Sequence, residues 1–331
     1  MSDLSPQAQT KLIKFTKDLI IKGSGIFHDG FKRTKIEIGK DILRNRIDKL
    51  EDCYLVTQDE SKTAIMNYGI DKFNFLELSN PDKKTILSIG TFDAHNQSKQ
   101  HKGYLITVPL PLTNDSFCTD RCNPPKGDAS FRCRFPDEII IDLDFLSQVP
   151  FEVHLLGLGE FIGIYYSIID YSKSRNMPVP INLLEFISDL FNKMIKLIIE
   201  NEQEIFLIYL SAGLALKCCI MRQANDHEIG CGGDHMIADV LEENYKLSHG
   251  QAVLYGAIIM ASLFPEWKQF GLSEEDLIKF GSTTALLDLA LFYEIKQTSS
   301  LINKAISHRP KRVTLLQDIH SQYRYKIDST G

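Results

Sequence analysis

The hydrophobic period of the sequence changes near residue 150, and this change limits the folds open to the chain. Before it, short runs rich in β-branched and aromatic residues alternate with helical or polar stretches, which is typical of an α/β domain with a largely parallel sheet. The predicted strands are Lys35–Ile38, Cys53–Thr57, Phe73–Leu78, Thr85–Ile89, Tyr104–Val108 and Glu138–Asp142.

After Pro150 the strand signals nearly vanish and apolar residues recur at helical spacing. Ser273 and Asp276 have the spacing of a weak capping box, and Pro310 follows the last long helical stretch. The sequence therefore predicts an α/β domain at residues 1–148 and an all-α domain at residues 149–331. The predicted helical stretches are Phe151–Phe186, Leu190–Met221, Asp234–Trp267 and Ser273–His308.

The composition is ordinary for a globular protein, with 44% hydrophobic and 24% charged residues in a chain of 331. A net charge of -6 argues against a nucleic-acid or anionic-membrane surface. The longest apolar run, Ile205–Leu216, is too short to span a bilayer and predicts a buried helix. Because the N-terminus does not resemble a signal peptide and the seven cysteines lack framework spacing, we expect a cytoplasmic protein with reduced thiols.

Two histidines in the C-terminal half open consecutive helical patterns. His235 follows the small-residue turn Cys231–Asp234, and His249 follows Leu247 and Ser248. Upstream, Glu160 lies beside glycines at the start of another helical stretch. One carboxylate and two imidazoles form the ligand set of a catalytic zinc site, because three protein ligands leave a position for water or substrate. Spacing alone leaves the alternative of satisfied core or capping histidines open.

A long irregular stretch rich in Pro, Asp and Cys separates Val108 from Glu138, and loops of this length are usually functional. Its three cysteines, Cys118, Cys122 and Cys133, would form an incomplete zinc site without a fourth ligand. We favour buried thiols at these positions.

Several motifs follow one another in an order that is more specific than any of them alone. They are Ile141–Asp144, Leu156–Tyr171, Ser211–Gly213, Gly232–Leu241, Leu247–Val253 and His308–Leu315. By these motifs the chain resembles, from about Ile36 to Asp318, the dehydroquinate-synthase-like superfamily. This superfamily includes the iron-type alcohol and glycerol dehydrogenases and the sn-glycerol-1-phosphate dehydrogenases.

The resemblance implies the dehydroquinate synthase-like fold, with an N-terminal Rossmann-like nucleotide-binding domain, a helical C-terminal domain and a metal in the cleft between them. It implies that Glu160, His235 and His249 bind a divalent metal, with zinc expected, and that NAD or NADP is the cofactor. Family members often form homodimers, although no interface is legible in this sequence.

The segment Val108–Phe117 resembles the family's VPT-x-x-S-x-D loop. The match implies that Thr113 contacts the cofactor and that Asp115 contacts the substrate. The alternative is a simple turn, because Thr-Asn-Asp is good turn chemistry.

The chain departs from the family at the dinucleotide loop. Only Gly90 remains of three glycines; Phe92 would fill space and Asp93 would repel a phosphate. A reshaped nicotinamide site, a different ligand and no nucleotide all stay open.

Other departures affect the metal and phosphate sites. The family dehydrogenases usually have Asp where this chain has Glu160, whereas the synthases have Glu followed by a lysine where this chain has Gly163. The family's arginine before the first histidine is missing near Glu228. Its alternatives as a phosphate ligand are His227, Arg222, Lys126 and Arg132.

One acidic residue and one basic cluster in the C-terminal half each allow two interpretations. Asp239 replaces a common family histidine and is either an acceptor for an imidazole N–H or a solvated residue. Arg309, Lys311 and Arg312 either interact with a helix C-terminus, which we favour, or contact an anion.

The preferred hypothesis is a metal-dependent NAD(P)-linked dehydrogenase of a small polyol phosphate, such as glycerol-1-phosphate or dihydroxyacetone phosphate. The first alternative is a divergent relative with altered or lost nicotinamide use, and the second is a dehydroquinate-synthase-like sugar phosphate cyclase. The expected partner is a small phosphorylated substrate, with neither nucleic acid nor membrane.

Overall fold

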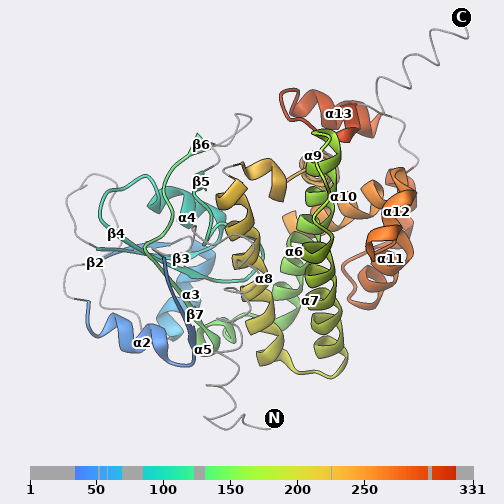
Figure 1. Ribbon diagram of the computed structural model, residues 1–331. Coiled ribbons are helices and arrows are strands. Elements are labelled where there is room, and N and C mark those ends of the chain that lie inside the picture. Colours follow the sequence, from blue (N-terminus) through green and yellow to red (C-terminus); the bar gives the residue numbers. More distant parts are fainter. Residues whose placement is uncertain are drawn as a thin grey trace, which may run out of the picture. The chain divides into compact units, whose positions relative to one another are not determined.

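The computed structural model describes residues 34–50, 53–57, 59–68, 85–122, 131–224, 226–296 and 300–317. The predicted strand Phe73–Leu78 and the residue Lys126 lie outside these ranges. The chain divides into two compact units, one of residues 1–154 and 197–222 and the other of residues 155–196 and 223–331. Their elements are labelled in Figure 1.

The first unit contains the predicted parallel sheet. In the described residues it has five strands in the order β1-β7-β4-β3-β2, every neighbouring pair parallel. The strands are β1 (Lys35–Gly39), β2 (Cys53–Thr57), β3 (Thr85–Gly90), β4 (Tyr104–Pro109) and β7 (Glu138–Asp142). All five residues of β7 are buried, as expected for a parallel strand covered on both faces. The prediction of an α/β domain is confirmed, with strand bounds that agree within one residue.

Helices and a small hairpin complete this unit. The helices are α2 (Ile42–Ile47), α3 (Asp59–Asn67), α4 (Phe92–Ser98), α5 (Leu143–Leu146) and α8 (Gln203–Ala224), and the hairpin pairs β5 (Arg121–Cys122) with β6 (Phe131–Arg132). Most of α8 is buried, in agreement with the prediction for its apolar run. Residues 197–222 group with the sheet and not with the other helices. The division of the chain into two domains at a single boundary near residue 148 therefore stays a prediction.

A buried carboxylate, Asp142, joins several elements of the first unit at the end of β7. Its Oδ1 accepts hydrogen bonds from the backbone N–H groups of Asp144 and Phe145 and so caps α5. Its Oδ2 accepts bonds from the backbone N–H of Leu43 at 2.8 Å and from the Tyr68 hydroxyl at 2.9 Å. The Ile141–Asp144 motif therefore has a structural role, because Asp142 fixes α2 and α5 against the sheet.

The second unit is helical. It is built from α6 (Phe151–Ser174), α7 (Ile181–Ile199), η2 (His227–Gly230), α9 (Gly233–Tyr245), α10 (His249–Leu263), η3 (Pro265–Phe270), α11 (Glu274–Thr283), α12 (Leu289–Lys296) and α13 (Leu301–His308), the ends of α6 and α7 belonging to the first unit. Among the described helices, α6 alone is long and apolar enough to cross a membrane. Since 83% of its most apolar window is buried within the protein, α6 is a core helix.

The helical stretches are shorter than the periodicity predicts. The chain turns at Asn176, Asn201, Lys246 and Ala285, each with a φ between 53° and 57°. This left-handed conformation ends a right-handed helix without interrupting the apolar pattern. At the first of these breaks, prolines at positions 178 and 180 also remove N–H donors that a continuous helix requires.

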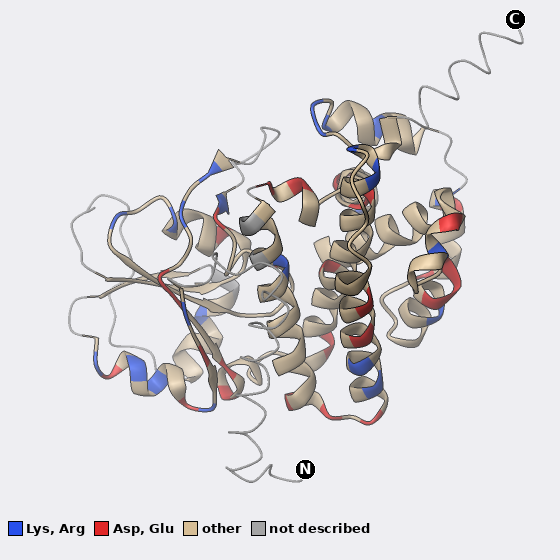
Figure 2. Ribbon diagram, in the orientation of Figure 1, with Lys and Arg blue, Asp and Glu red and all other residues tan. Residues whose placement is uncertain are grey.

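The predicted capping box at the start of α11 is present. The Ser273 hydroxyl accepts from the Asp276 backbone N–H, and the Asp276 carboxylate accepts from the Ser273 N–H. Acidic residues fill the first turn of this helix, where they favour its positive end (Figure 2).

Glycines bring the backbones of three helices of the second unit into contact. A Cβ at Gly159 of α6 would lie 1.8 Å from the carbonyl oxygen of Gly250 in α10, and a Cβ at Gly250 would lie 1.9 Å from the Leu156 oxygen. At Gly256, a Cβ would lie 2.2 Å from the Asp234 oxygen at the start of α9. Only glycine permits these approaches, and they set the positions of the residues beside them.

We predict that Gly250→Ala lowers the free energy of unfolding by at least ~2 kcal/mol, because the added methyl group forces α6 and α10 apart. The matched control is Ser262→Ala, also on α10 but only half-buried, with an expected change within ~0.5 kcal/mol. Urea unfolding of the metal-free proteins measures both. A Gly250→Ala variant as stable as the parent would contradict the close helix contact.

Candidate metal centre

Three side chains from different helices of the second unit meet at one point. Glu160 comes from the third turn of α6, and not from the start of a helix as predicted, because α6 already begins at Phe151. His235 comes from the first turn of α9 and His249 from the first residue of α10. The Nε2 atoms of His235 and His249 lie 3.4 and 3.0 Å from the Glu160 Oε2. Their potential ligand atoms all lie within 4.8 Å of one another. The structure thus brings together the three predicted ligands, whose binding of a metal stays a prediction.

Hydrogen bonds on the far side of each ring fix the orientation of both imidazoles. The His235 Nδ1 lies 2.8 Å from Asp234 Oδ2, and the His249 Nδ1 lies 2.7 Å from Glu242 Oε1. A carboxylate can only accept, so each Nδ1 carries a proton and each Nε2 of a neutral ring presents a lone pair to Glu160. Carboxylates in this position orient histidines that bind metals and increase their basicity.

The carboxylate of Glu160 and the imidazoles of His235 and His249 fit a cation and not an uncharged ligand. Glu160 is 1% exposed, and a buried carboxylate facing two imidazole lone pairs requires a positive charge between them. In the protein without a metal, a proton supplies that charge. Burial lowers the pKa of His249, but Glu160 and Glu242 outweigh this effect and raise the pKa to about 10. The His249 side chain is 38% exposed, which leaves one side of the centre open to a ligand from solution.

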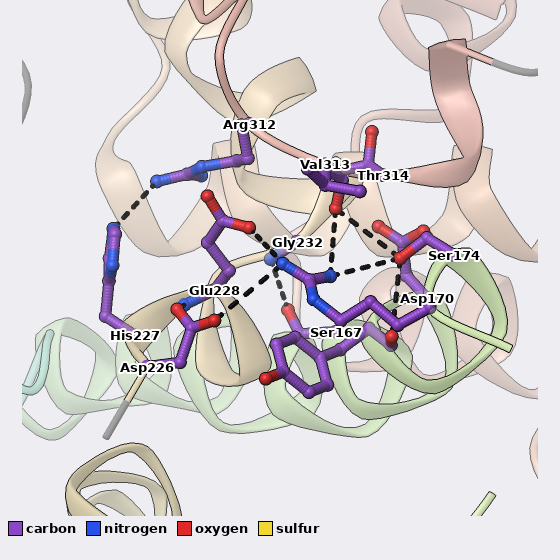
Figure 3. A network of polar contacts seen from close by, with 12 residues as sticks. Ser167, Asp170, Ser174, Asp226, His227, Glu228, Gly232, Arg312, Val313 and Thr314 are labelled. Carbon is purple, nitrogen blue, oxygen red and sulfur yellow. Dashed lines mark hydrogen bonds and ion pairs between the residues drawn. The ribbon is translucent and has the colours of Figure 1, made fainter. Parts of the chain in front are cut away.

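One face of α6 holds the turn that precedes α9. The Ser167 hydroxyl accepts from the Gly232 N–H at 2.8 Å (Figure 3). The same hydroxyl donates to Asp234 Oδ1 at 2.7 Å. Asp170, one turn further, accepts from the Gly233 N–H at 2.8 Å. Burial raises the pKa of Asp170 to about 7, although its backbone hydrogen bonds lower it. Ser167 and Asp170 therefore fix Asp234, and through it the ring of His235.

The packing around Gly163 separates this site from that of the cyclases. A Cβ at Gly163 would lie 2.6 Å from Val253 Cγ1 and 2.8 Å from Asp234 Oδ2. The position at which the resemblance places the lysine of the cyclases is thus filled by Val253 and Asp234.

Sequence reasoning missed the residues that support the ligands. Asp234 directly precedes His235, and Glu242 lies seven residues before His249. Ser167 and Asp170 follow Glu160 at intervals of seven and ten residues, which places them on one helix face. The helix face shared by Ser167 and Asp170 could have been recognised in the sequence. The contact of Glu242 with His249 could not, because it depends on the turn at Lys246.

Both interpretations of Asp239 are wrong, whereas Arg309 does lie at a helix C-terminus, where it is the C-cap of α13 and its backbone N–H donates to the Ala305 oxygen. Asp239 neither binds an imidazole nor stays solvated, since its two carboxylate oxygens accept from the Nε and Nη2 of Arg309. The Arg309 side chain accordingly pairs with α9, not with the carbonyl groups at the end of a helix. Arg–carboxylate pairs of this bidentate kind are geometrically specific.

The predicted nucleotide and substrate residues belong to the first unit. Gly90 ends β3 with a φ of 143°, a conformation that favours glycine. Thr113 is half-buried in the loop after β4, where the Asn114 side chain accepts from the Ser116 N–H and forms the expected turn. Asp115 projects from the same turn with its side chain 17% exposed.

Two buried lysines that the sequence analysis did not consider hold this loop. The Lys99 ammonium group donates to the carbonyl oxygens of Ser116 at 2.6 Å and Arg121 at 3.1 Å. The Lys217 Nζ, on α8, lies 3.6 Å from Asp115 Oδ2. Lys99 thus connects the end of α4 to the loop that carries Thr113 and Asp115, and Lys217 balances the charge of Asp115.

Phe92 and Asp93, which we expected to fill space and to repel a phosphate in the predicted dinucleotide loop, obstruct that loop less than their residue types suggest. Phe92 is 38% exposed, and Asp93, in the first turn of α4, is also exposed. Phe92 therefore leaves the turn at Gly90 unfilled. Water screens the charge of an exposed carboxylate, which weakens but does not abolish repulsion of a phosphate.

The cysteines of the long loop do not assemble a metal site. Cys118 Sγ lies 3.0 Å from Cys218 Sγ on α8, and both thiols are buried. Burial raises the pKa of Cys118, which disfavours the thiolate that zinc requires. Among the described residues, the candidate group of three His, Cys, Asp or Glu ligands is Glu160, His235 and His249.

Comparison with known proteins finds similarity to curated dehydrogenases, although no protein-family model matches the chain. It is 25% identical over 237 residues to a glycerol-1-phosphate dehydrogenase [NAD(P)+] of Aeropyrum pernix, covering 66% of this chain and 64% of the relative. It is also 25% identical over 225 residues to the Methanosarcina acetivorans enzyme of the same name, covering 64% and 61%. The chain thus spans less than two thirds of the length of these relatives.

Solved structures share the fold. A probable glycerol dehydrogenase from Sinorhizobium meliloti superimposes with a TM-score of 0.66 and 17% identity, covering 85% of this chain and 91% of the other. An iron-containing alcohol dehydrogenase from Thermotoga maritima gives 0.60 and 16%, covering 85% and 92%. The predicted fold is confirmed.

We predict that Asp234→Asn lowers the affinity for zinc about 10-fold to 100-fold, because an amide neither fixes the Nδ1 proton of His235 nor increases the basicity of its ring. Competition with a chromophoric chelator measures the change. The control is Glu243→Gln, an exposed carboxylate of the same helix, and we expect it to bind zinc as the parent does. Equal affinities for all three proteins would contradict the role of Asp234.

We predict that metal binding strengthens with pH. Because His249 has a pKa of about 10 without a metal, the cation must displace its proton, and the affinity should rise up to about tenfold per pH unit below that value. In the metal-free protein the same proton stabilises the fold fully below the ordinary histidine pKa of 6.5, and this contribution is lost as the pH rises through the folded-state pKa of about 10. The melting temperatures of loaded and metal-free protein should therefore diverge between pH 6.5 and 9. A pH-independent difference would contradict the displaced proton.

Proposed function

We propose that this chain, a distant member of the superfamily of the dehydroquinate synthases and iron-type alcohol dehydrogenases, is a metal-dependent oxidoreductase linked to NAD or NADP. Its proposed substrate is a small polyol phosphate, such as glycerol-1-phosphate or dihydroxyacetone phosphate. The observation that carries this proposal is the convergence of Glu160, His235 and His249, each imidazole oriented by a carboxylate.

The three ligands would hold a divalent cation, for which zinc is our first choice. When bound, the cation supplies Lewis acidity that acidifies a hydroxyl group or polarises a carbonyl group. Glu160 contributes the negative charge that retains the cation, and Asp234 and Glu242 keep both Nε2 lone pairs directed at it. The exposed side of His249 admits the substrate oxygen.

Residues of the first unit would bind the other reactants. Gly90 provides the turn for a dinucleotide, with Thr113 as a contact, and a bound nicotinamide supplies hydride acceptance or donation. Asp115 would accept a hydrogen bond from a second substrate hydroxyl and so orient the reacting carbon. Its pairing with Lys217 supports this role, because it keeps a partly buried carboxylate as an acceptor.

A second candidate is a metal-dependent relative that no longer uses nicotinamide. The observation that favours it is Asp93, which lies in the first turn of α4, where a pyrophosphate would meet the end of the helix. We rank it second because that carboxylate is exposed. The cyclase is not retained, since Val253 and Asp234 fill the space beside Gly163.

We predict that zinc-loaded protein oxidises NADH or NADPH with dihydroxyacetone phosphate, and that chelation abolishes this turnover until zinc is returned. Glu160→Gln should lower kcat/KM at least 100-fold, because it removes the anionic ligand. Glu152→Gln, an exposed position earlier on the same helix, is the control and should leave turnover unchanged. Full turnover by metal-free protein would refute the proposal. Failure of either dinucleotide to bind in a fluorescence titration of zinc-loaded protein would favour the second candidate.

A further inference from the structure

Arg312, in the segment after α13, is a buried cation that has no paired anion among the residues that the structure describes. The residue is 6% exposed, and its Nη2 lies 3.3 Å from His227 Nε2 (Figure 3). Its Nη1 is shielded from solvent and has no hydrogen-bond partner in the described part of the chain. Burial and the neighbouring Arg309 both lower the pKa of Arg312, which reflects the cost of a charge in this place.

The contact with His227 does not neutralise this charge. A guanidinium group has no acceptor, so the His227 Nε2 must accept the hydrogen bond. The imidazole is then neutral, with its proton on Nδ1. His227 therefore orients the Arg312 side chain and leaves its positive charge in place.

The carboxylates around Arg312 are bound to other arginines. Asp239 accepts both hydrogen bonds of Arg309, and Glu228 is paired with Arg175, which also lies 3.8 Å from Asp226. The negative charge of Glu228 favours the charged form of Arg312 electrostatically, but the ion pair of Glu228 is with Arg175. A buried charge that lacks a paired anion is costly, which points to an anion supplied from outside the chain.

The position of the two arginines relates them to the metal centre. Arg309 binds Asp239, which lies one helical turn after His235 on α9, and Glu242, the partner of His249, lies three residues further. Residues at these spacings share one face of the helix. Arg309 thus lies along the face of α9 that carries the metal centre, paired with a residue about one turn, or 5.4 Å, from His235. The charges of Arg309 and Asp239 both act on Arg312, which lies near them.

We propose that Arg312, held by His227, binds the phosphoryl group of the substrate. A planar guanidinium group matches the oxygens of a phosphate and binds them more strongly than neutral donors do. The inference rests on the proposed function and deepens it, because it makes the phosphorylated polyol, and not the free polyol, the substrate. It also supplies, from later in the chain, an arginine in place of the family's missing arginine near Glu228.

A direct test titrates zinc-loaded protein with inorganic phosphate and follows the melting temperature and the heat of binding. The variant is Arg312→Met, which keeps an unbranched apolar stem in place of the charged side chain, and the control is Lys311→Met, which removes the same charge from an exposed neighbour. We expect phosphate to stabilise the parent and Lys311→Met alike, and its affinity to fall at least tenfold in Arg312→Met.

The change in melting temperature that Arg312→Met causes in phosphate-free buffer distinguishes a phosphate-binding role of Arg312 from a purely structural role. Removing an unpaired buried charge should leave the melting temperature of Arg312→Met equal to or above that of the parent in phosphate-free buffer. A lower melting temperature there, or unchanged phosphate affinity in the variant, would overturn the proposal.

Kinetics distinguish the substrate phosphate from a phosphate bound elsewhere. We expect inorganic phosphate to compete with glycerol-1-phosphate, and Arg312→Met to raise KM for glycerol-1-phosphate at least tenfold, with a much smaller loss of kcat/KM for glycerol. Non-competitive phosphate, or equal losses with both substrates, would overturn the substrate role. If no polyol is turned over but phosphate binding still requires Arg312, the proposed function fails while the oxyanion site is supported.

Discussion

The direct backbone contact between α6 and α10 determines where the charged groups of the second unit lie. Gly159 and Gly250 meet with no room for a Cβ on either side, and the next residue on α6 and the preceding residue on α10 are Glu160 and His249. A third glycine brings the start of α9, and with it His235, against α10. Helix packing therefore assembles the ligands before any cation is present, and the nearby carboxylates orient them.

The sequence predicted the elements and residues whose signals are local. The strands followed from short β-branched runs, and Glu160, His235 and His249 followed from residue type, from glycines beside them and from a resemblance in motif order. Features that depend on tertiary contacts were missed. The left-handed turns at Asn176 and Lys246 leave the apolar pattern intact, so the helices were predicted too long. The pairing of Asp239 with Arg309 joins residues 70 positions apart, and nothing local indicates it.

Charge compensation links the metal centre to the proposed phosphate site. In the second unit, Asp234 and Glu242 are hydrogen-bonded to the two imidazoles. Asp239 is paired with Arg309, and Glu228 is paired with Arg175. Two buried groups of opposite sign lie in this unit: the Glu160 carboxylate, which faces both imidazoles, favours a cation, and the Arg312 guanidinium, which has no paired anion among the described residues, favours an anion. A phosphorylated alcohol bound to a metal brings both together in one substrate complex, which is the physical reason for preferring a polyol phosphate.

The central claim is that one cation is bound by a carboxylate and two imidazoles of the second unit. Diffraction from a crystal of zinc-loaded protein, recorded at the zinc absorption edge, tests it most directly. The account predicts one anomalous peak about 2.0–2.2 Å from a Glu160 oxygen and from the Nε2 atoms of His235 and His249. A zinc-loaded crystal without a peak bonded to all three side chains, or with its zinc on the cysteines of the long loop, would contradict it.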